Sequence, residues 1–257
     1  MSPPSNKLAI FSWCLYDFAN TIFSMNVISL YFALWVTVDH DGQDILYSTA
    51  LSLSMLAVAL SVPVFGALSD TTRKRRVPLI GLTLLCIFST GMIGTTNHLW
   101  TGLILFMVAN YGYQSALVFY NGMLPSISRG SHVGLVSGYG VALGYLGSIL
   151  GMVLVKPFVE SGGRSAAFLP TAGLLLLFSL PCFLFVKDHN TRSAPLFRIK
   201  EAFNTLKETF LRARQYYSLF RFILIHFLVL DAVNTIIAFM SVYASKVIGF
   251  DDGQIIK

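Results

Sequence analysis

Long apolar segments alternate with short polar segments along almost the whole chain. Each apolar segment holds about twenty residues, which is the length a helix needs to cross a ~30 Å hydrocarbon layer. The pattern predicts seven membrane helices, over residues 8–36, 47–68, 77–95, 100–122, 134–155, 165–186 and 220–243. We therefore expect an all-α polytopic membrane protein.

One polar segment, residues 187–218, is much longer than the others. Its apolar residues recur at alternating steps of three and four, which is the pattern of one helix face. The segment is therefore predicted to form a basic amphipathic helix at the membrane surface, with a solvated linker as the alternative. It separates a six-helix unit, residues 1–186, from residues 219–257, which hold the seventh helix and the segment after it.

The composition supports a membrane protein and excludes an ordinary soluble domain. Hydrophobic residues make up 55% of the chain and charged residues only 12%, about half the charge of a soluble domain. A net charge of +6 would suit a nucleic-acid partner, but the cations lie between apolar segments, so we expect a lipid bilayer and no nucleic acid. The cysteines, Cys14, Cys86 and Cys182, lie singly in apolar segments, so no metal site, cofactor or disulfide is expected.

The basic residues predict the orientation. All but four of the 18 Lys and Arg fall on the same side of the membrane as the N-terminus; the exceptions are Lys156, Arg164, Lys246 and Lys257. By the positive-inside rule the N-terminus is cytoplasmic, and a bacterial inner membrane is favoured over a eukaryotic organelle. The first and seventh helices then run in the same direction, as a parallel repeat offset by six helices requires.

The candidate chemistry lies in a hexapeptide that the first and last helices share. Residues 17–22 read DFANTI and residues 231–236 read DAVNTI, with four of six positions identical. Each Asp lies about 15 Å into its helix, near the middle of the bilayer, where an ionisable side chain is a functional hypothesis by default. The alternatives are a hydrogen-bond clamp between helices and a chance match.

Further polar side chains extend this candidate site. Those of the first and seventh helices follow each Asp on one helix face, while those of the fourth helix either line the same cavity or bond between helices. The candidate substrate-binding or coupling residues are Asp17, Asn20, Ser24, Asn110, Gln114, Asp231 and Asn234. Two such helices facing one cavity could bind a small polar solute, and because desolvation favours a protonated carboxylic acid, the two Asp residues could also carry protons.

A row of glycines in the fifth helix is interpreted chiefly as a packing signal. Gly140, Gly144, Gly147 and Gly151 are separated by steps of 4, 3 and 4. They form a smooth face that allows another helix backbone to approach closely.

The second polar loop carries a different pattern. Residues 66–76 read GALSDTTRKRR, with a Gly, a Leu, an Asp and then a basic cluster. This resembles the loop signature of the major facilitator superfamily, although Arg73 stands where that pattern usually has a second Gly. The resemblance implies a gating loop that contains Gly66, Asp70, Arg73 and Lys74. A basic loop that only sets the topology is the alternative.

The sequence of the first helix narrows the resemblance to one branch of the superfamily. Residues 13–20, WCLYDFAN, resemble the vacuole-effluxer-like branch of that superfamily, which includes the autophagy-related amino-acid effluxers and related bacterial carriers. Residues 138–147 and Asp231 fit the same branch. The resemblance implies a major-facilitator-like bundle and alternating access to a site near mid-membrane, with an amino-acid-like solute by analogy. Such carriers have about twelve helices, so the chain corresponds to a six-helix half plus helix seven of an incomplete second half.

The leading hypothesis is therefore a secondary transporter of a small solute, coupled to protons through its membrane Asp residues. The alternative is a truncated membrane scaffold, or a fragment that depends on a partner for the missing C-terminal helices. We expect no enzyme and no catalytic residues, because the sequence holds no HExxH, no Gly-x-Ser-x-Gly and no pair of catalytic carboxylates in one segment.

Overall fold

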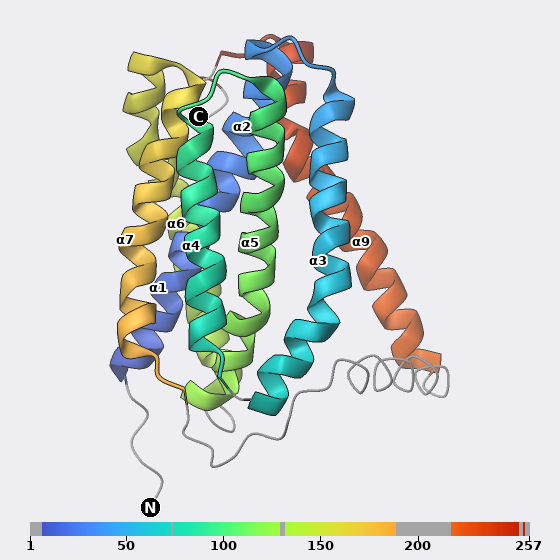
Figure 1. Cartoon of the computed structure of the whole chain (residues 1–257). Helices are drawn as coiled ribbons and strands as arrows, with labels where there is room; N and C mark the ends of the chain where they lie inside the picture. Colours follow the sequence, from blue (N-terminus) through green and yellow to red (C-terminus); the bar gives the residue numbers. More distant parts are fainter. Residues whose placement is uncertain (1–6, 73, 129–131, 189–216, 252–253, 255–257) are drawn as a thin grey trace, which may run out of the picture.

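The computed structural model describes residues 7–72, 74–128, 132–188, 217–251 and 254. Within these ranges the chain is almost entirely helical and forms no strand (Figure 1). Seven helices in the described part are long and apolar enough to cross a membrane. The expected all-α polytopic architecture is therefore confirmed.

The first span changes its winding along its length. It begins as an α-helix and continues as two π-helical stretches separated by a short α-helical turn. In order, these elements are α1 (Lys7–Phe23), η1 (Ser24–Tyr31), α2 (Phe32–Leu34) and η2 (Trp35–Asp39). Single π-helical turns are already uncommon, and they are frequent at functional sites.

The remaining spans are more regular. They are α3 (Asp44–Thr72), α4 (Arg76–Ile93), α5 (Leu99–Ile127), α6 (Val133–Gly162), α7 (Phe168–Phe185) and α9 (Tyr217–Tyr243). A 3-10 turn, η4 (Arg164–Ala167), precedes α7, and a π-helical turn, η5 (Ala244–Ile248), follows α9.

Three helices continue beyond their expected ends. Helix α3 extends past residue 68, α5 extends past residue 122, and α6 extends past residue 155 through a segment expected to be a loop. The additional turns of α6 contain an ion pair between Lys156 and Glu160 at 3.6 Å, one helical turn apart, which stabilises helix rather than ending it. The helix ends instead at Gly163, whose φ of 73° favours glycine.

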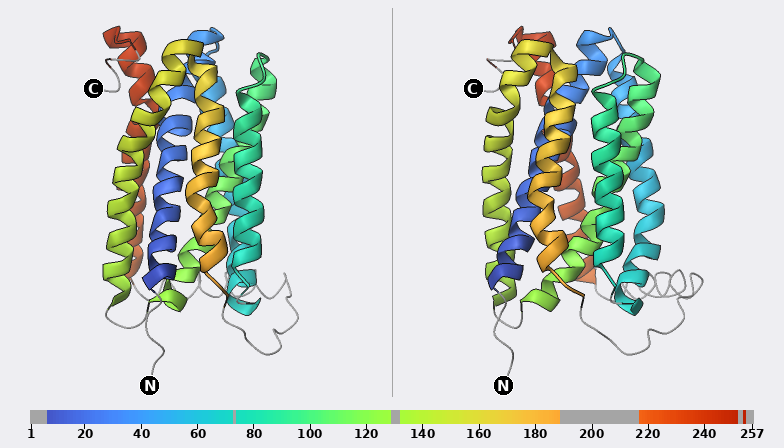
Figure 2. Two further views of the ribbon diagram at one scale, coloured as in Figure 1. Left: turned by 90° about the vertical axis from the view of Figure 1, so that its left-hand side faces the viewer. Right: turned by 60° about the vertical axis from the view of Figure 1, so that its left-hand side comes forward.

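Helix α1 lies inside the bundle, packed between α6 and α7 (Figure 2). Helix α4 packs against α5 and α7, and α3 packs against α5. The close approach of α1 to α6 depends on the glycine face of α6, where all four glycines are buried. A Cβ at Gly147 would overlap the Phe18 carbonyl oxygen and would lie 2.8 Å from the Thr21 hydroxyl. A larger residue there would separate the two helices.

Aromatic side chains fill the core around the second half of the first span, beyond the end of α1. Phe32 stacks on Phe106 of α5 with ring centroids 4.2 Å apart, and Trp35 contacts Phe168 of α7 edge-on at 6.3 Å. The indole nitrogen of Trp35 donates a hydrogen bond to the Ser165 hydroxyl at 2.9 Å. These contacts hold the first span rigidly against the rest of the bundle.

The contacts of helix α9 with the bundle that the described residues show lie in its C-terminal part, at the end of the bundle away from Lys7. There the Ser241 hydroxyl donates a hydrogen bond to the Ser29 carbonyl at 2.7 Å, and Phe239 packs edge-on against Tyr47 of α3. Residues 220–237 are exposed, and Figure 1 shows α9 diverging from the other helices toward the Lys7 end. In the described structure α9 is therefore joined to the other helices near its C-terminal end.

The spans alternate in direction, so α4, α6 and α9 begin at the Lys7 end, where α3, α5 and α7 finish (Figures 1 and 2). The basic loop between α3 and α4 lies at this end, which agrees with the topology that the cations predict. Which side of the membrane this end faces stays a prediction. The expected amphipathic connection falls largely on residues 189–216, outside the described residues.

Candidate functional site

Asp17 lies half-buried on α1, facing the glycine face of α6. Its Oδ2 atom is 3.2 Å from the position a Cβ would occupy at Gly144. Next to it, the Thr21 hydroxyl contacts the Gly144 carbonyl at 2.7 Å and the Asp17 carbonyl at 2.9 Å. Among the described residues, no Lys or Arg forms an ion pair with Asp17. A carboxyl group at this depth without a cationic partner is suited to take up a proton or to bind a polar solute.

The other two candidates on the first span have different environments. Ser24 is half-buried like Asp17, and its hydroxyl lies next to the phenol of Tyr113. Asn20 is buried, and its Nδ2 has no hydrogen-bond partner among the described residues. Seven residues almost complete two helical turns, so positions 17 and 24 point the same way, whereas position 20 points aside into the bundle.

The polar residues of α5 also divide between two environments. Asn110 is fully buried between α5 and α3, and its Nδ2 donates a hydrogen bond to the Ser54 hydroxyl at 2.7 Å. This is the interhelical bond that the sequence left open as an alternative to cavity lining. Gln114, one turn further along, is half-buried, and Asn121 is exposed. Of these three residues, Gln114 is the one whose side chain is half-buried to the same degree as Asp17.

The second copy of the hexapeptide is not enclosed by the described residues. Asp231 and Asn234 are both exposed on α9, which packs against η1 and α2 rather than against α1. The local geometry of the repeat is nevertheless preserved, because the Thr235 hydroxyl donates to the Asp231 carbonyl at 2.8 Å, as Thr21 does to Asp17. The described part of the chain therefore does not bring the two Asp residues into one site.

An aromatic cluster beside Asp17 was not anticipated from the sequence. Trp13 stacks on Tyr120 of α5 with ring centroids 4.3 Å apart, and its indole nitrogen donates to the Tyr120 carbonyl at 3.1 Å. Tyr16 packs against the same ring at 5.0 Å and shares a hydrogen bond with Thr83 of α4 at 2.6 Å. The signal was present in the sequence, since two aromatic residues with polar atoms lie within one helical turn of Asp17.

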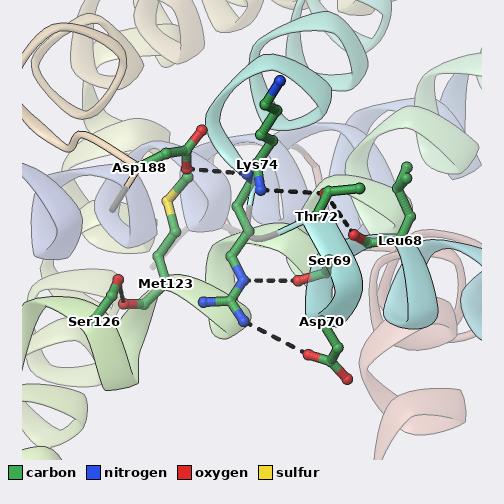
Figure 3. Close-up of polar contacts among 9 residues, drawn as sticks. Leu68, Ser69, Asp70, Thr72, Lys74, Met123, Ser126 and Asp188 are labelled. Atoms are coloured by element: carbon green, nitrogen blue, oxygen red, sulfur yellow. Dashed lines mark hydrogen bonds and ion pairs between the residues drawn. The ribbon is translucent and has the colours of Figure 1, made fainter. Parts of the chain in front are cut away.

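The last turn of α3 and the short loop to α4 form a compact polar cluster at the Lys7 end (Figure 3). The expectation of a loop from Asp70 was wrong, because α3 continues as helix through Thr72. Asp70 is exposed and lies 3.6 Å from the guanidinium of Arg75, whose Nε donates to the Ser69 hydroxyl at 2.8 Å. The side chain of Lys74 is exposed, and Gly66 has open space around its Cα. Arg73 lies outside the described residues.

Asp188, just after α7, completes this cluster and was not singled out from the sequence. Its carboxylate accepts a hydrogen bond from the backbone N–H group of Arg75 at 3.0 Å (Figure 3). It accepts another from the backbone N–H group of Arg76 at 3.2 Å. The first turn of α4 carries unpaired N–H groups and a partial positive charge, both of which favour a carboxylate at this position. The Arg76 guanidinium in turn donates to the Phe183 carbonyl. The end of α7 is thereby joined to the start of α4.

Comparison with known proteins identifies the family. The sequence profile of the Major Facilitator Superfamily matches residues 16–256, which is nearly the whole chain. The chain belongs to the Major Facilitator Superfamily. This confirms the superfamily that the loop pattern suggested, and with it a multi-pass membrane protein. The narrower vacuole-effluxer-like branch stays a prediction.

Two relatives in this comparison are bacterial. An uncharacterized MFS-type transporter of Bacillus subtilis, YxiO, is 27% identical over 254 residues, which cover 91% of this chain and 59% of the relative. An uncharacterized protein of Aquifex aeolicus is 27% identical over 258 residues, covering 99% of this chain and 62% of the relative. The chain thus spans about three fifths of the length of the curated relatives it matches.

Among the described residues, no cluster of His, Cys, Asp or Glu side chains could hold a metal ion.

Proposed function

We propose that the protein moves a small solute across a bacterial inner membrane as a secondary transporter, with Asp17 as its coupling residue. The observation that carries this proposal is the Asp17 carboxyl group, half-buried near the middle of a membrane span and without an ion-pair partner among the described residues. Membership of the Major Facilitator Superfamily and the bacterial relatives support it. By analogy with the vacuole-effluxer-like branch, the solute is amino-acid-like, and protons drive its movement.

The proposed transport unit follows the expected division of the chain. Residues 1–186 form one repeat, residues 187–218 are the cytoplasmic connection and residues 219–257 begin the second repeat. The contacts of α9 fit one of the two states of an alternating-access cycle. Near its C-terminal end α9 is held by the Ser241 hydrogen bond, whereas residues 220–237 are exposed in the described structure. In this proposal α9 moves relative to the bundle about the end that Ser241 holds.

Asp17 provides a route to proton coupling. When Asp17 is protonated, it is neutral and is tolerated while the site is closed off from water. When it is charged, it favours contact with water or with a cationic group of the solute. Ser24 and Gln114 are the other half-buried polar side chains proposed to contact the solute. In this proposal Asn20 and Asn110 maintain the helix packing that orients them.

The test is uptake of a mixture of radiolabelled amino acids into proteoliposomes under an imposed pH gradient. We expect Asp17→Asn to reduce gradient-driven accumulation at least tenfold, because the amide cannot release a proton. The matched control is Asp41→Asn, which neutralises an exposed loop residue at a φ of 48° that Asn adopts readily. Accumulation by Asp17→Asn at the wild-type level, with intact protein in the vesicles, would refute the coupling role.

A second candidate function is a membrane scaffold or a partner-dependent fragment. It is favoured by the exposed inner part of α9, which offers an apolar surface at residues 220–237. The intact mass of the protein from its native membrane separates the two candidates. A mass well above the 28.3 kDa of this sequence supports a complete transporter, whereas a mass of 28.3 kDa supports the scaffold.

A further inference from the structure

The half-buried side chain of His40 lies between two backbone carbonyl groups, at the end of the bundle away from Lys7. Its Nδ1 atom is 3.0 Å from the Trp35 carbonyl oxygen, and its Nε2 atom is 3.1 Å from the Asn97 carbonyl oxygen. Trp35 belongs to the first span, whereas Asn97 lies in the turn between α4 and α5. One imidazole ring therefore joins two segments that are far apart in the sequence.

The two contacts of His40 require different numbers of ring protons in its two charge states. A carbonyl oxygen only accepts hydrogen bonds, so each contact needs an N–H group on the ring. A neutral imidazole carries one N–H group and would present a lone pair to the second carbonyl oxygen. The imidazolium carries two, and both distances are those of N–H···O bonds. The charged form of His40 therefore satisfies both contacts, and the neutral form satisfies only one.

The place of His40 at the end of the first span also favours a positive charge. His40 is the C-cap residue of η2, and the Trp35 carbonyl that it contacts lies in the last turn of that helix. Carbonyl groups at a helix C-terminus carry a partial negative charge, which a cationic side chain stabilises. The ring centroids of His40 and Trp35 are 4.0 Å apart, within the range of a cation–π contact. The Trp35 indole is itself held by its hydrogen bond to Ser165.

The charged and titratable side chains around this end of the bundle come from the loop of His40, the α4–α5 turn, η4, α3 and η5. They are Asp39, Asp41, Asp44, His98, Arg164 and Lys246. Four of them form two ion pairs, Asp39 with Arg164 and Asp44 with Lys246. Asp41 is exposed and forms no ion pair among the described residues, so one carboxylate is left in excess. Because Asp41 directly follows His40, its charge favours a cation on the ring.

We propose that His40 is a pH-sensitive latch, which in its charged form ties the end of the first span to the α4–α5 turn. Loss of one ring proton leaves one of the two carbonyl groups without a donor, so the ring then holds one segment and not both. Histidine is the side chain that ordinarily changes charge between about pH 5 and 8, so the latch closes at acidic pH and opens at alkaline pH. With the predicted cytoplasmic N-terminus, it responds to the pH outside the cell. The latch does not depend on the proposed transport function.

The first test is hydrogen–deuterium exchange of the purified protein in lipid nanodiscs at about pH 5 and about pH 8, corrected for the intrinsic pH dependence of exchange. The amides followed are on either side of the latch, at Gly42, which bonds to the Val36 carbonyl, and at Thr96, which bonds to the Ile93 carbonyl. We expect wild-type protection to be about fivefold greater at the acidic pH, because a hydrogen bond from a charged group is lost at the alkaline pH.

The matched variants are His40→Gln and His98→Gln. The glutamine amide at position 40 does not titrate and has a donor nitrogen for one carbonyl group only, so we expect His40→Gln to remove the pH dependence of protection. His98 is an exposed histidine next to Asn97 in the same turn, so His98→Gln should keep the wild-type pH dependence. An equal loss of pH dependence in both variants, or equal wild-type protection at the two pH values, would overturn the latch.

A second measurement detects the ring protons of His40 in the unmodified chain. The protein is labelled with ¹⁵N-histidine, and the ring resonances of His40 are assigned as those that His40→Gln removes. At about pH 5 both ring nitrogens should resonate as N–H groups, and at about pH 8 one of them should have lost its proton. A His40 ring that is neutral at about pH 5 would contradict the latch even if His40→Gln failed to fold.

Discussion

Helices α1 and α9 carry nearly the same hexapeptide, yet among the described residues they have opposite environments. In the most apolar window of each span, 72% of residues are buried in the first and 6% in the last. The local hydrogen bond from Thr to Asp is the same in both. The two helices differ in their neighbours. Among the described residues, α1 lies between α6 and α7, whereas α9 packs mainly against η1 and α2 through its C-terminal part. Local sequence therefore determines the helix, and the packing partner determines whether its polar face becomes a site.

The largest change in stability should come from a substitution that separates α1 from α6, the helix against which it packs. Gly147→Leu would place a side chain against the Phe18 carbonyl and separate α6 from α1. We expect a loss of about 3 kcal/mol in the free energy of unfolding, measured by denaturant titration. Gly138→Leu is the control, because this exposed glycine of α6 has nothing within 4 Å of its Cβ position. Equal losses in both variants would mean that the glycine face does not hold α1.

A smaller loss of stability should distinguish the two copies of the hexapeptide, when the same Thr→Val substitution is made in each. Thr21→Val removes a 2.7 Å hydrogen bond to the Gly144 carbonyl of α6, whereas Thr235→Val removes only a bond within α9. We expect a cost of about 1 kcal/mol for the first and less than about 0.5 kcal/mol for the second. The same denaturant titration measures both. If Thr235→Val costs as much as Thr21→Val, then α9 is packed in the membrane in a way that these contacts do not describe.

The smallest effect should be at the end where α9 joins the bundle. Lys246 pairs with Asp44 at the start of α3 at 2.7 Å, and both side chains are substantially exposed. We expect Lys246→Gln to cost about 0–1 kcal/mol at low salt and nothing measurable at high salt. The control is Lys187→Gln, which removes an exposed lysine at the opposite end of the bundle. An effect that is unchanged by salt would show that Lys246 acts through packing rather than charge.

The sequence was sufficient for the helices and for the family. Apolar length predicts each span, because a bilayer leaves few alternatives to a helix for an uninterrupted apolar segment. The glycine spacing in α6 points to the face that meets α1, since spacing on one helix is a local property. The ends of α5 and α6 were less predictable. Polar residues such as Lys156 and Glu160 continue a helix as readily as they form a loop.

The candidate site was predicted only where it depends on one helix. Depth in the membrane identifies Asp17, but Tyr120, which stacks on Trp13 one turn before Asp17, comes from a segment about a hundred positions away. Asn110 was left open, because a polar residue on α5 suits a cavity or an interface equally well until α3 supplies Ser54. Asp188 was missed for the same reason, as its partner is the backbone at the start of another helix.

The side-chain contacts of Arg75 and Arg76 change what the basic loop offers to its surroundings. The Arg75 guanidinium is engaged with Asp70 and Ser69, and that of Arg76 with the Phe183 carbonyl. These charges count toward the topology during insertion, but in the folded protein they are directed at its own groups. Of the described cations in this loop, Lys74 is the exposed one and is left for anionic lipid headgroups. The lipid attraction of the loop is therefore weaker than its sequence of consecutive cations implies.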